Sequence, residues 1–200
     1  ATPNWGIDGP MTWLVAQLLS DPHQNADVLL NEYYERYFQE SAAPMRRFFE
    51  RCEEQWMRQS GPSYWLKHFR NESQADLFPS PVCTELRRQL DEAGRLARRG
   101  KVHARVALVS DAFGVTERFV RMNESRARLS RETVTMQLAG PDGVELLATY
   151  LDARHDFIRY SQETTARQPL AFSTILYDDF LRNDPTVAAV AALSAFLSDT

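Results

Sequence analysis

The chain has 200 residues and a mass of 23.0 kDa, the size of about one ordinary domain with a core of its own. Its hydrophobic fraction of 44% and charged fraction of 25% are typical of a folded globular protein. No run of about eighteen apolar residues predicts a membrane-spanning helix, and the first thirty residues lack a signal-peptide pattern. With only 8 Gly and 10 Pro, the composition argues against a turn-rich sandwich, a barrel or a disordered chain. It therefore predicts a helical protein with no membrane partner.

The basic residues are concentrated in the middle of the chain. Residues 87–131 hold 12 basic and 5 acidic side chains, a net charge of +7, whereas residues 1–86 sum to −5 and residues 132–200 to −6. Such a segment can face an anionic partner, or it can pack between acidic helices of the same fold. Its only aromatic residues are Phe113 and Phe119, which argues against a surface that stacks on single-stranded nucleic acid.

The two cysteines and four histidines do not form a metal-binding or disulfide pattern. Cys52 and Cys83 are too few for a disulfide framework or a four-thiolate zinc site. Cys52 lies among aromatic residues at helical spacing and is expected in the core, with a bridge to Cys83 as the alternative. The histidines have no second ligand at metal-binding spacing, so we expect no metal. Two cysteines do not indicate whether the protein works in an oxidising or a reducing cellular compartment.

Helical spacing of apolar residues runs through the first half of the chain. A short amphipathic run at 13–19 stops at 20–22, and Asn25 is a suitable N-cap for the next helix. A third helix is expected from about residue 42, with apolar side chains at Met45, Phe49, Cys52 and Trp56. An aromatic turn or short helix follows at 64–69.

The second half continues in the same pattern. Helices are expected at about 82–99 and 102–125, and another is expected around 134–138. Residues 142–145 have the form of a capping box that opens a helix through Ile158. Two final helices are expected at 172–181 and 184–200, the second with Asp184 at its N-cap. The sequence predicts an all-α fold, an irregular bundle of about eight to ten helices, with a single helical domain over 13–200.

Residues 1–12 are expected to form a loop and a helix entry. Two glycines, a proline, Trp5 and Asp8 lie within residues 4–10, which is typical of an ordered loop. A tryptophan ring can stack on a sugar face while a carboxylate takes its hydroxyls, so Trp5 and Asp8 are candidate carbohydrate-binding residues. The alternative is a turn in which Trp5 fills the core. No phosphate-binding loop, nucleophile elbow or catalytic pair is found, so we predict no catalytic residue and no cofactor.

A set of positions between residues 5 and 45 carries a resemblance to a known family. They are Trp5-Gly6, Asp8-Gly9-Pro10, Trp13, Ala16, Leu18-Leu19, Asp21-Pro22, Leu29-Leu30, Glu32-Tyr33-Tyr34, Arg36-Tyr37-Phe38 and Ala42-Ala43-Pro44-Met45. Together they resemble a stretch of large bacterial proteins with a domain of unknown function, relatives of the α-glucuronidase and β-hexosaminidase group of glycoside hydrolases. The sequence departs from that pattern at Ser20, where Trp is expected, and near Gln39, where Gly is expected.

The resemblance implies a role for the chain. In that family the stretch follows the last strand of a (β/α)8 catalytic barrel and leads into a C-terminal helical region, so the catalytic carboxylates would lie upstream of residue 1. Barrel active sites are built from the loops at that end, which implies that Trp5 and Asp8 contribute to a sugar subsite. The chain alone is then expected to be inactive, to brace the barrel and to offer a homodimer contact. The alternative is a stand-alone helical interaction module that binds an anionic or protein partner through residues 87–131.

Overall fold

The computed structural model describes residues 5–58, 76–134 and 141–168, and every regular element in these ranges is helical, which confirms the all-α prediction. The expected elements at 64–69, 172–181 and 184–200 lie outside the described residues. The elements are α1 (Trp5–Ser20), α2 (Ala26–Phe38), the 3-10 turn η1 (Gln39–Ser41), α3 (Ala42–Met57), α4 (Ser80–Leu96), α5 (Gly100–Val134) and α6 (Pro141–Arg167).

The end of α1 and the starts of α2 and α3 lie at the predicted boundaries. The side chain of Asn25 accepts hydrogen bonds from the backbone N–H groups of Asp27 (2.9 Å) and Val28 (3.1 Å), as expected of an N-cap. The third helix starts at Ala42, as predicted. The chain also leaves the first helix after Ser20, at the expected break.

The loop predicted for residues 4–10 is wrong from Trp5 onward, where α1 begins with Pro10 inside it. The backbone of a proline cannot donate the usual helical hydrogen bond, and two glycines weaken the same turn. Gly6, Gly9 and Pro10 are all buried, so packing of this turn against its neighbours outweighs its poor helix propensity.

Two other boundaries also differ from the prediction. The helix expected to stop near Ser125 continues to Val134, because buried Leu129 extends its apolar face by another turn. Residues 135–140, where a separate helix was expected to end, lie outside the described residues. The next helix begins at Pro141, one residue before the predicted N-cap Asp142.

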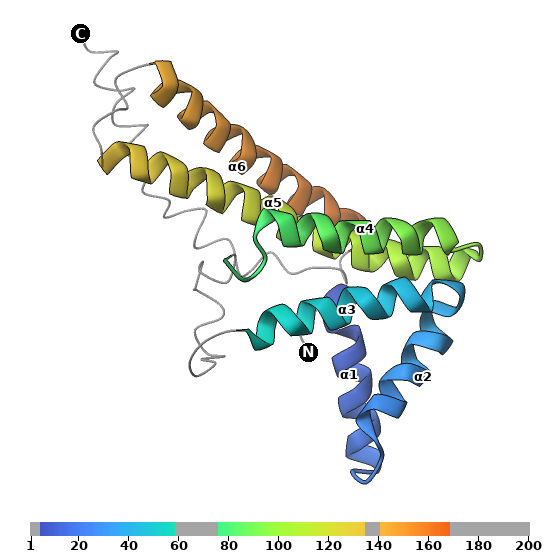
Figure 1. The fold of residues 1–200 in the computed structure, drawn as a ribbon. Helices are drawn as coiled ribbons and strands as arrows, with labels where there is room; N and C mark the ends of the chain where they lie inside the picture. The colour runs from blue at the N-terminus through green and yellow to red at the C-terminus, as the bar shows by residue number, and fades with distance from the viewer. Residues whose placement is uncertain (1–4, 59–75, 135–140, 169–200) are drawn as a thin grey trace.

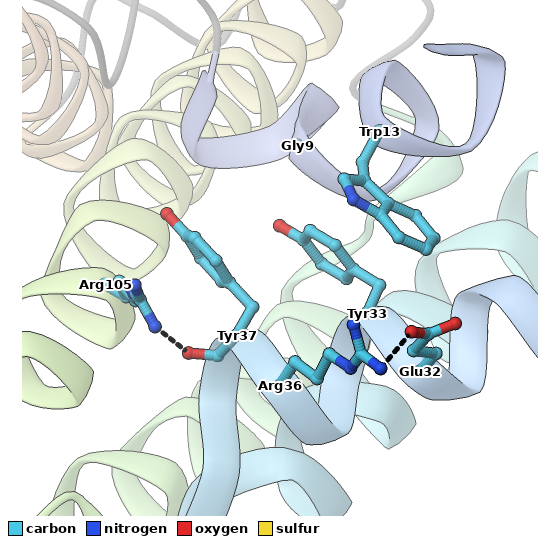
Figure 2. A pocket seen from close by; sticks show the side chains of 7 residues that line it. All are labelled: Gly9, Trp13, Glu32, Tyr33, Arg36, Tyr37 and Arg105. Carbon is cyan, nitrogen blue, oxygen red and sulfur yellow. Dashed lines mark hydrogen bonds and ion pairs between the residues drawn. The ribbon is translucent and has the colours of Figure 1, made fainter. Parts of the chain in front are cut away.

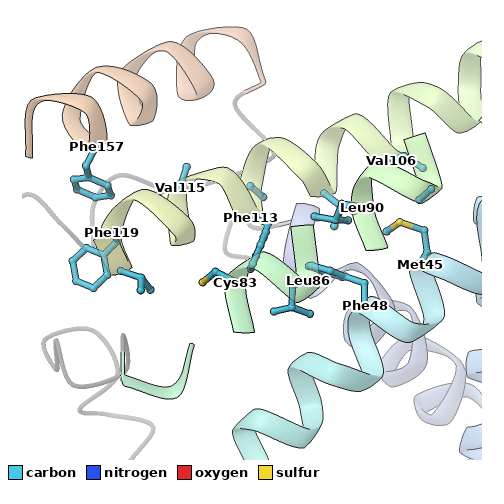
Figure 3. Close-up of a cluster of buried hydrophobic side chains, with 14 of the residues drawn as sticks. Met45, Phe48, Cys83, Leu86, Leu90, Val106, Phe113, Val115, Phe119 and Phe157 are labelled. Atoms are coloured by element: carbon cyan, nitrogen blue, oxygen red, sulfur yellow. The ribbon is translucent and has the colours of Figure 1, made fainter. Parts of the chain in front are cut away.

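Helix α5 is the spine of the fold (Figure 1). Helix α6 runs antiparallel to α5, and Arg167 at the end of α6 is 3.0 Å from the carboxylate of Asp111 in the first half of α5. Helices α4, α1 and α2 also pack on α5, and α3 lies against α4. The core is continuous along this spine (Figure 3); its large, fully buried side chains include Phe38, Met45, Phe48, Leu86, Leu90, Val102, Val115, Val120, Met122, Tyr150 and Phe157.

The sharp bend between α2 and α3 is fixed by contacts with the junction of α4 and α5. Gln39 has φ 46° and ψ −114°, the only positive φ at a non-glycine position among the described residues. The Glu40 carboxylate accepts hydrogen bonds from the backbone N–H groups of Arg98 (2.9 Å) and Arg99 (3.1 Å). The buried Ser41 hydroxyl donates to the carbonyl of Ala93 at 2.8 Å. These bonds set the position of α2 relative to α5.

Candidate functional site

A pocket of about 300 Å³ opens between α1, α2 and α5 (Figure 2). This volume lies at the lower end of the range of about 300–1,000 Å³ that is typical of small-molecule sites. Its lining combines aromatic rings with charged side chains from segments far apart in the sequence: Gly9, Trp13, Glu32, Tyr33, Arg36, Tyr37 and Arg105.

Four of these side chains form a row. The rings of Tyr33 and Tyr37 are stacked with centroids 5.1 Å apart, and the indole of Trp13 is tilted against Tyr33 at 5.5 Å. At the other end, the guanidinium carbon of Arg105 lies 4.3 Å from the centroid of the Tyr37 ring. Figure 2 shows both tyrosine hydroxyls pointing the same way, toward α1. The pocket therefore has an aromatic wall that ends in a cation.

The spacing of residues on α2 and a glycine on α1 create this arrangement. Tyr33 and Tyr37 are one helical turn apart, as are Glu32 and Arg36, whose carboxylate and guanidinium are 2.7 Å apart. Helix α1 approaches at Gly9, where an added β-carbon would lie 2.8 Å from the Tyr33 hydroxyl. A residue without a side chain is required there for the aromatic wall to keep its position.

The wall carries polar groups without partners in the described part of the chain. Neither the indole N–H of Trp13 nor the hydroxyls of Tyr33 and Tyr37 has a hydrogen-bond partner there, and burial raises the pKa of Tyr33. Arg105 donates from Nη1 to the backbone carbonyl of Tyr37 at 2.7 Å. These groups can take hydroxyls or an anionic group, while the rings offer an apolar face.

The predicted sugar-binding residues both lie on α1, the helix that supplies one side of this pocket. Trp5 is the first residue of α1 and Asp8 is in its first turn, where partial burial raises the pKa of the carboxyl group. The neighbouring Gly9 lines the pocket and Asp8 does not. A sugar-binding role for Trp5 and Asp8 therefore stays a prediction.

The residues that form the wall are not among the site residues predicted from the sequence. In the sequence, Tyr33 and Tyr37 belong to the positions that carry the family resemblance, and Arg105 is one cation of the basic segment 87–131. The one-turn spacing of the two tyrosines was visible in the sequence, but the pairing of Arg105 with Tyr37 joins positions 68 residues apart.

The outer face of α1 carries an apolar stripe, which we define as Ile7, Met11, Val15 and Leu19. These residues are spaced by four and have exposed fractions of 41%, 62%, 47% and 82%. A helix that is apolar on both faces is usually buried on both. In the described part of the chain, only the opposite face of α1 is covered, by α2 and α5.

Much of the basic segment is neutralised within the fold. Arg87 forms an ion pair with Glu117, and its Nη1 donates to the hydroxyl of Ser110 at 2.6 Å. Asp156 on α6 is 3.3 Å from Arg118 and 3.4 Å from Arg121. Other cations are exposed and have no ion pair with the described residues: Arg88, Arg95, Arg98, Lys101 and Arg128.

The remaining site predictions can be compared with the described residues. Cys52 and Cys83 are free thiols, so the alternative of a bridge is wrong, and burial raises the pKa of each to about 12. Within residues 5–58, 76–134 and 141–168, no group of acids, cysteines and histidines could hold a metal ion, and no helix is long and apolar enough to cross a membrane. No protein-family model, no curated protein and no solved structure matches the chain.

Proposed function

We propose that this chain is a non-catalytic, helical C-terminal portion of a glycoside-hydrolase-like protein, and that it binds carbohydrate in the pocket between α1, α2 and α5. The observation that carries the proposal is the row formed by Trp13, Tyr33, Tyr37 and Arg105. Sugars present a weakly polar ring face surrounded by hydroxyls, and an aromatic wall with unpartnered donors suits both features.

Two further features support the family role. A helical portion that braces a catalytic barrel needs an apolar contact surface, and the stripe on α1 supplies one next to the segment that resembles the end of a barrel. The resemblance also leads us to expect glycine near position 39. Gln39 holds a positive φ, a backbone conformation that glycine adopts most easily.

The described lining of the pocket does not contain the pair of carboxyl groups needed for glycoside hydrolysis. Most glycosidases use two carboxyl groups, one as a general acid and one as a nucleophile or base. Of the residues that the structure describes, Glu32 is the single carboxylate that lines this pocket, and it is paired with Arg36 at 2.7 Å. We therefore expect the chain alone to bind sugar without cleaving it, and expect hydrolysis only when a barrel with its own carboxylates is joined upstream.

A glycan-binding screen with a matched pair of variants tests the proposal. The wild-type chain should bind a subset of a broad panel of immobilised glycans, and Trp13→Leu should weaken that binding by roughly tenfold through loss of the ring face. Trp56→Leu is the control, because Trp56 lies on α3 and does not line the pocket. Circular dichroism checks that both variants fold. If no glycan binds, or if the two variants bind equally, the proposal is wrong.

The alternative proposal is a helical interaction module that binds an anionic partner through residues 87–131. The exposed cations Arg88, Arg95 and Arg128 favour it, whereas the ion pairs of Arg87 and Arg118 leave less free charge than the sequence suggested. Binding to polyglutamate over a range of salt concentrations distinguishes the two proposals. A log–log slope of several units, by analogy with the release of counterions from nucleic acids, would favour the module.

A further inference from the structure

We infer that the ligand of the pocket between α1, α2 and α5 is an acidic sugar, whose carboxylate or sulfate group is held by Arg105. This inference rests on the proposed carbohydrate-binding function and names the class of sugar. It depends on the position of one guanidinium, on the charges around it and on the hydrogen-bonding capacity that it has left.

Arg105 is a half-buried cation with no ion pair among the described residues. Its guanidinium lies against the ring of Tyr37 at 4.3 Å, and Nη1 donates to the Tyr37 carbonyl at 2.7 Å. These two contacts hold the planar group in place and leave Nε and Nη2 without a partner in the described part of the chain. A guanidinium held in this way can bind an oxyanion through two parallel hydrogen bonds.

The other charges at the pocket do not neutralise Arg105. Among the described residues, Glu32 is the only carboxylate in the lining, and its charge is matched by Arg36 at 2.7 Å. Lys101 is exposed and lies one helical turn before Arg105, so it adds positive charge on the same face of α5. The described lining residues therefore carry a net charge of one positive unit, at the end of the aromatic wall.

The geometry joins this charge to a surface for a ring. Arg105 continues the row of Tyr37, Tyr33 and Trp13, so one ligand can place its ring along the wall and its acidic substituent at the guanidinium (Figure 2). Phenol and indole donors along the same wall can bind the hydroxyls of that ring. A neutral sugar would use the wall and leave the half-buried cation without an anion, which is the costlier arrangement.

The test compares matched ligands on the intact 200-residue chain. The glycan panel contains neutral oligosaccharides, the same backbones with uronate groups, the methyl esters of those uronates, and sulfated forms. We expect acidic glycans to bind roughly 10- to 100-fold more tightly than their neutral counterparts, as expected for a charge-assisted hydrogen-bond pair. Methyl esterification should remove this preference without any change to the protein. Comparison of the uronate-containing and the sulfated glycans identifies which anionic group is preferred.

Protein variants then locate the preference at Arg105. Arg105→Gln should reduce the affinity for acidic glycans to that for neutral ones, and Arg105→Lys should retain part of the preference because it keeps the charge. Arg88→Gln removes an exposed cation from α4 that does not line the pocket, and it should leave binding unchanged.

The outcomes separate this inference from the proposed function. If neutral and acidic glycans bind equally well, or if Arg88→Gln acts like Arg105→Gln, the inference is wrong while carbohydrate binding stands. If no glycan of any charge binds, both are wrong. The methyl esters keep the inference testable even if Arg105→Gln fails to fold.

Discussion

Replacing Gln39 by glycine is expected to leave the protein more stable than replacing it by alanine. At an ordinary helical position the order is reversed, with glycine about 0.5–1 kcal/mol worse than alanine. Gln39 has φ 46° and ψ −114°, where the β-carbon of any L-residue crowds the backbone. The sign of the difference between the two variants therefore reports the backbone conformation at this bend.

The magnitude follows from three terms. Strain at a positive φ is of the order of 1–3 kcal/mol, and glycine relieves it while alanine does not. Both variants lose the hydrogen bond that the Gln39 side chain accepts from Arg99, so this loss cancels in the comparison. Glycine also costs about 0.5–1 kcal/mol in the entropy of the unfolded chain. The glycine variant should thus exceed the alanine variant by about 0.5–2 kcal/mol in the free energy of unfolding.

Urea unfolding followed by circular dichroism measures this difference, and Gly94 on α4 provides a reciprocal control. A β-carbon at Gly94 would have no atom within 4 Å, so Gly94→Ala should raise the free energy of unfolding by about 0.5–1 kcal/mol. Glycine is then the better residue at position 39 and alanine the better residue at position 94. If Gln39→Ala is as stable as Gln39→Gly or more stable, the positive φ at the end of α2 is refuted.

Further predictions concern the caps, the packing of the helices and the thiols. Asn25→Ala should lower the free energy of unfolding by about 1 kcal/mol in a urea titration, because two N–H groups lose their acceptor. Gly114→Ala should lower the free energy of unfolding by about 1–2 kcal/mol, since the new β-carbon would lie 2.8 Å from Cζ of Tyr160. An unchanged midpoint of urea unfolding would contradict the packing of α5 on α6. Burial raises the pKa of Cys52 and Cys83 to about 12, against about 8.5 for a free thiol. Iodoacetamide at pH 8 should therefore label the native chain far more slowly than the urea-unfolded chain. Equal rates would show that the thiols are accessible.

The spacing of apolar residues correctly predicted those helices in which the local sequence signals and the packing of the core favour the same structure. In α5 the residues Val102, Val106, Val109 and Phe113 follow one face of a helix, and all four are buried. Asn25 begins α2 because its side chain competes well for the first free N–H groups. In such segments each local preference favours the same structure that the core requires, so the sequence alone is sufficient.

The first helix and the pocket could not be predicted in this way. Residues 5–10 have the composition of a loop, and they become helical because burial of Gly6, Gly9 and Pro10 outweighs their low propensity. The pocket depends on how α1, α2 and α5 meet, which local spacing does not specify. Arg105 had the same appearance in the sequence as the other arginines of the basic segment, and only the fold places it on Tyr37.

Helix α1 connects the two parts of the proposed function, because its opposite faces have different partners. One face presents Gly9 and Trp13 to the pocket. Successive residues of a helix turn by about 100°, so the stripe that includes Met11 and Val15 lies on the other side of the same two turns. A rigid helix that packs on a barrel through this stripe would therefore hold Trp13 at a fixed distance from the barrel.

The low helix propensity of the first turn means that α1 depends on packing for its stability. Covering the outer face would stabilise the helix that forms one wall of the pocket, and binding of a sugar against Trp13 would stabilise the same helix from the inner side. By thermodynamic linkage each contact would then strengthen the other.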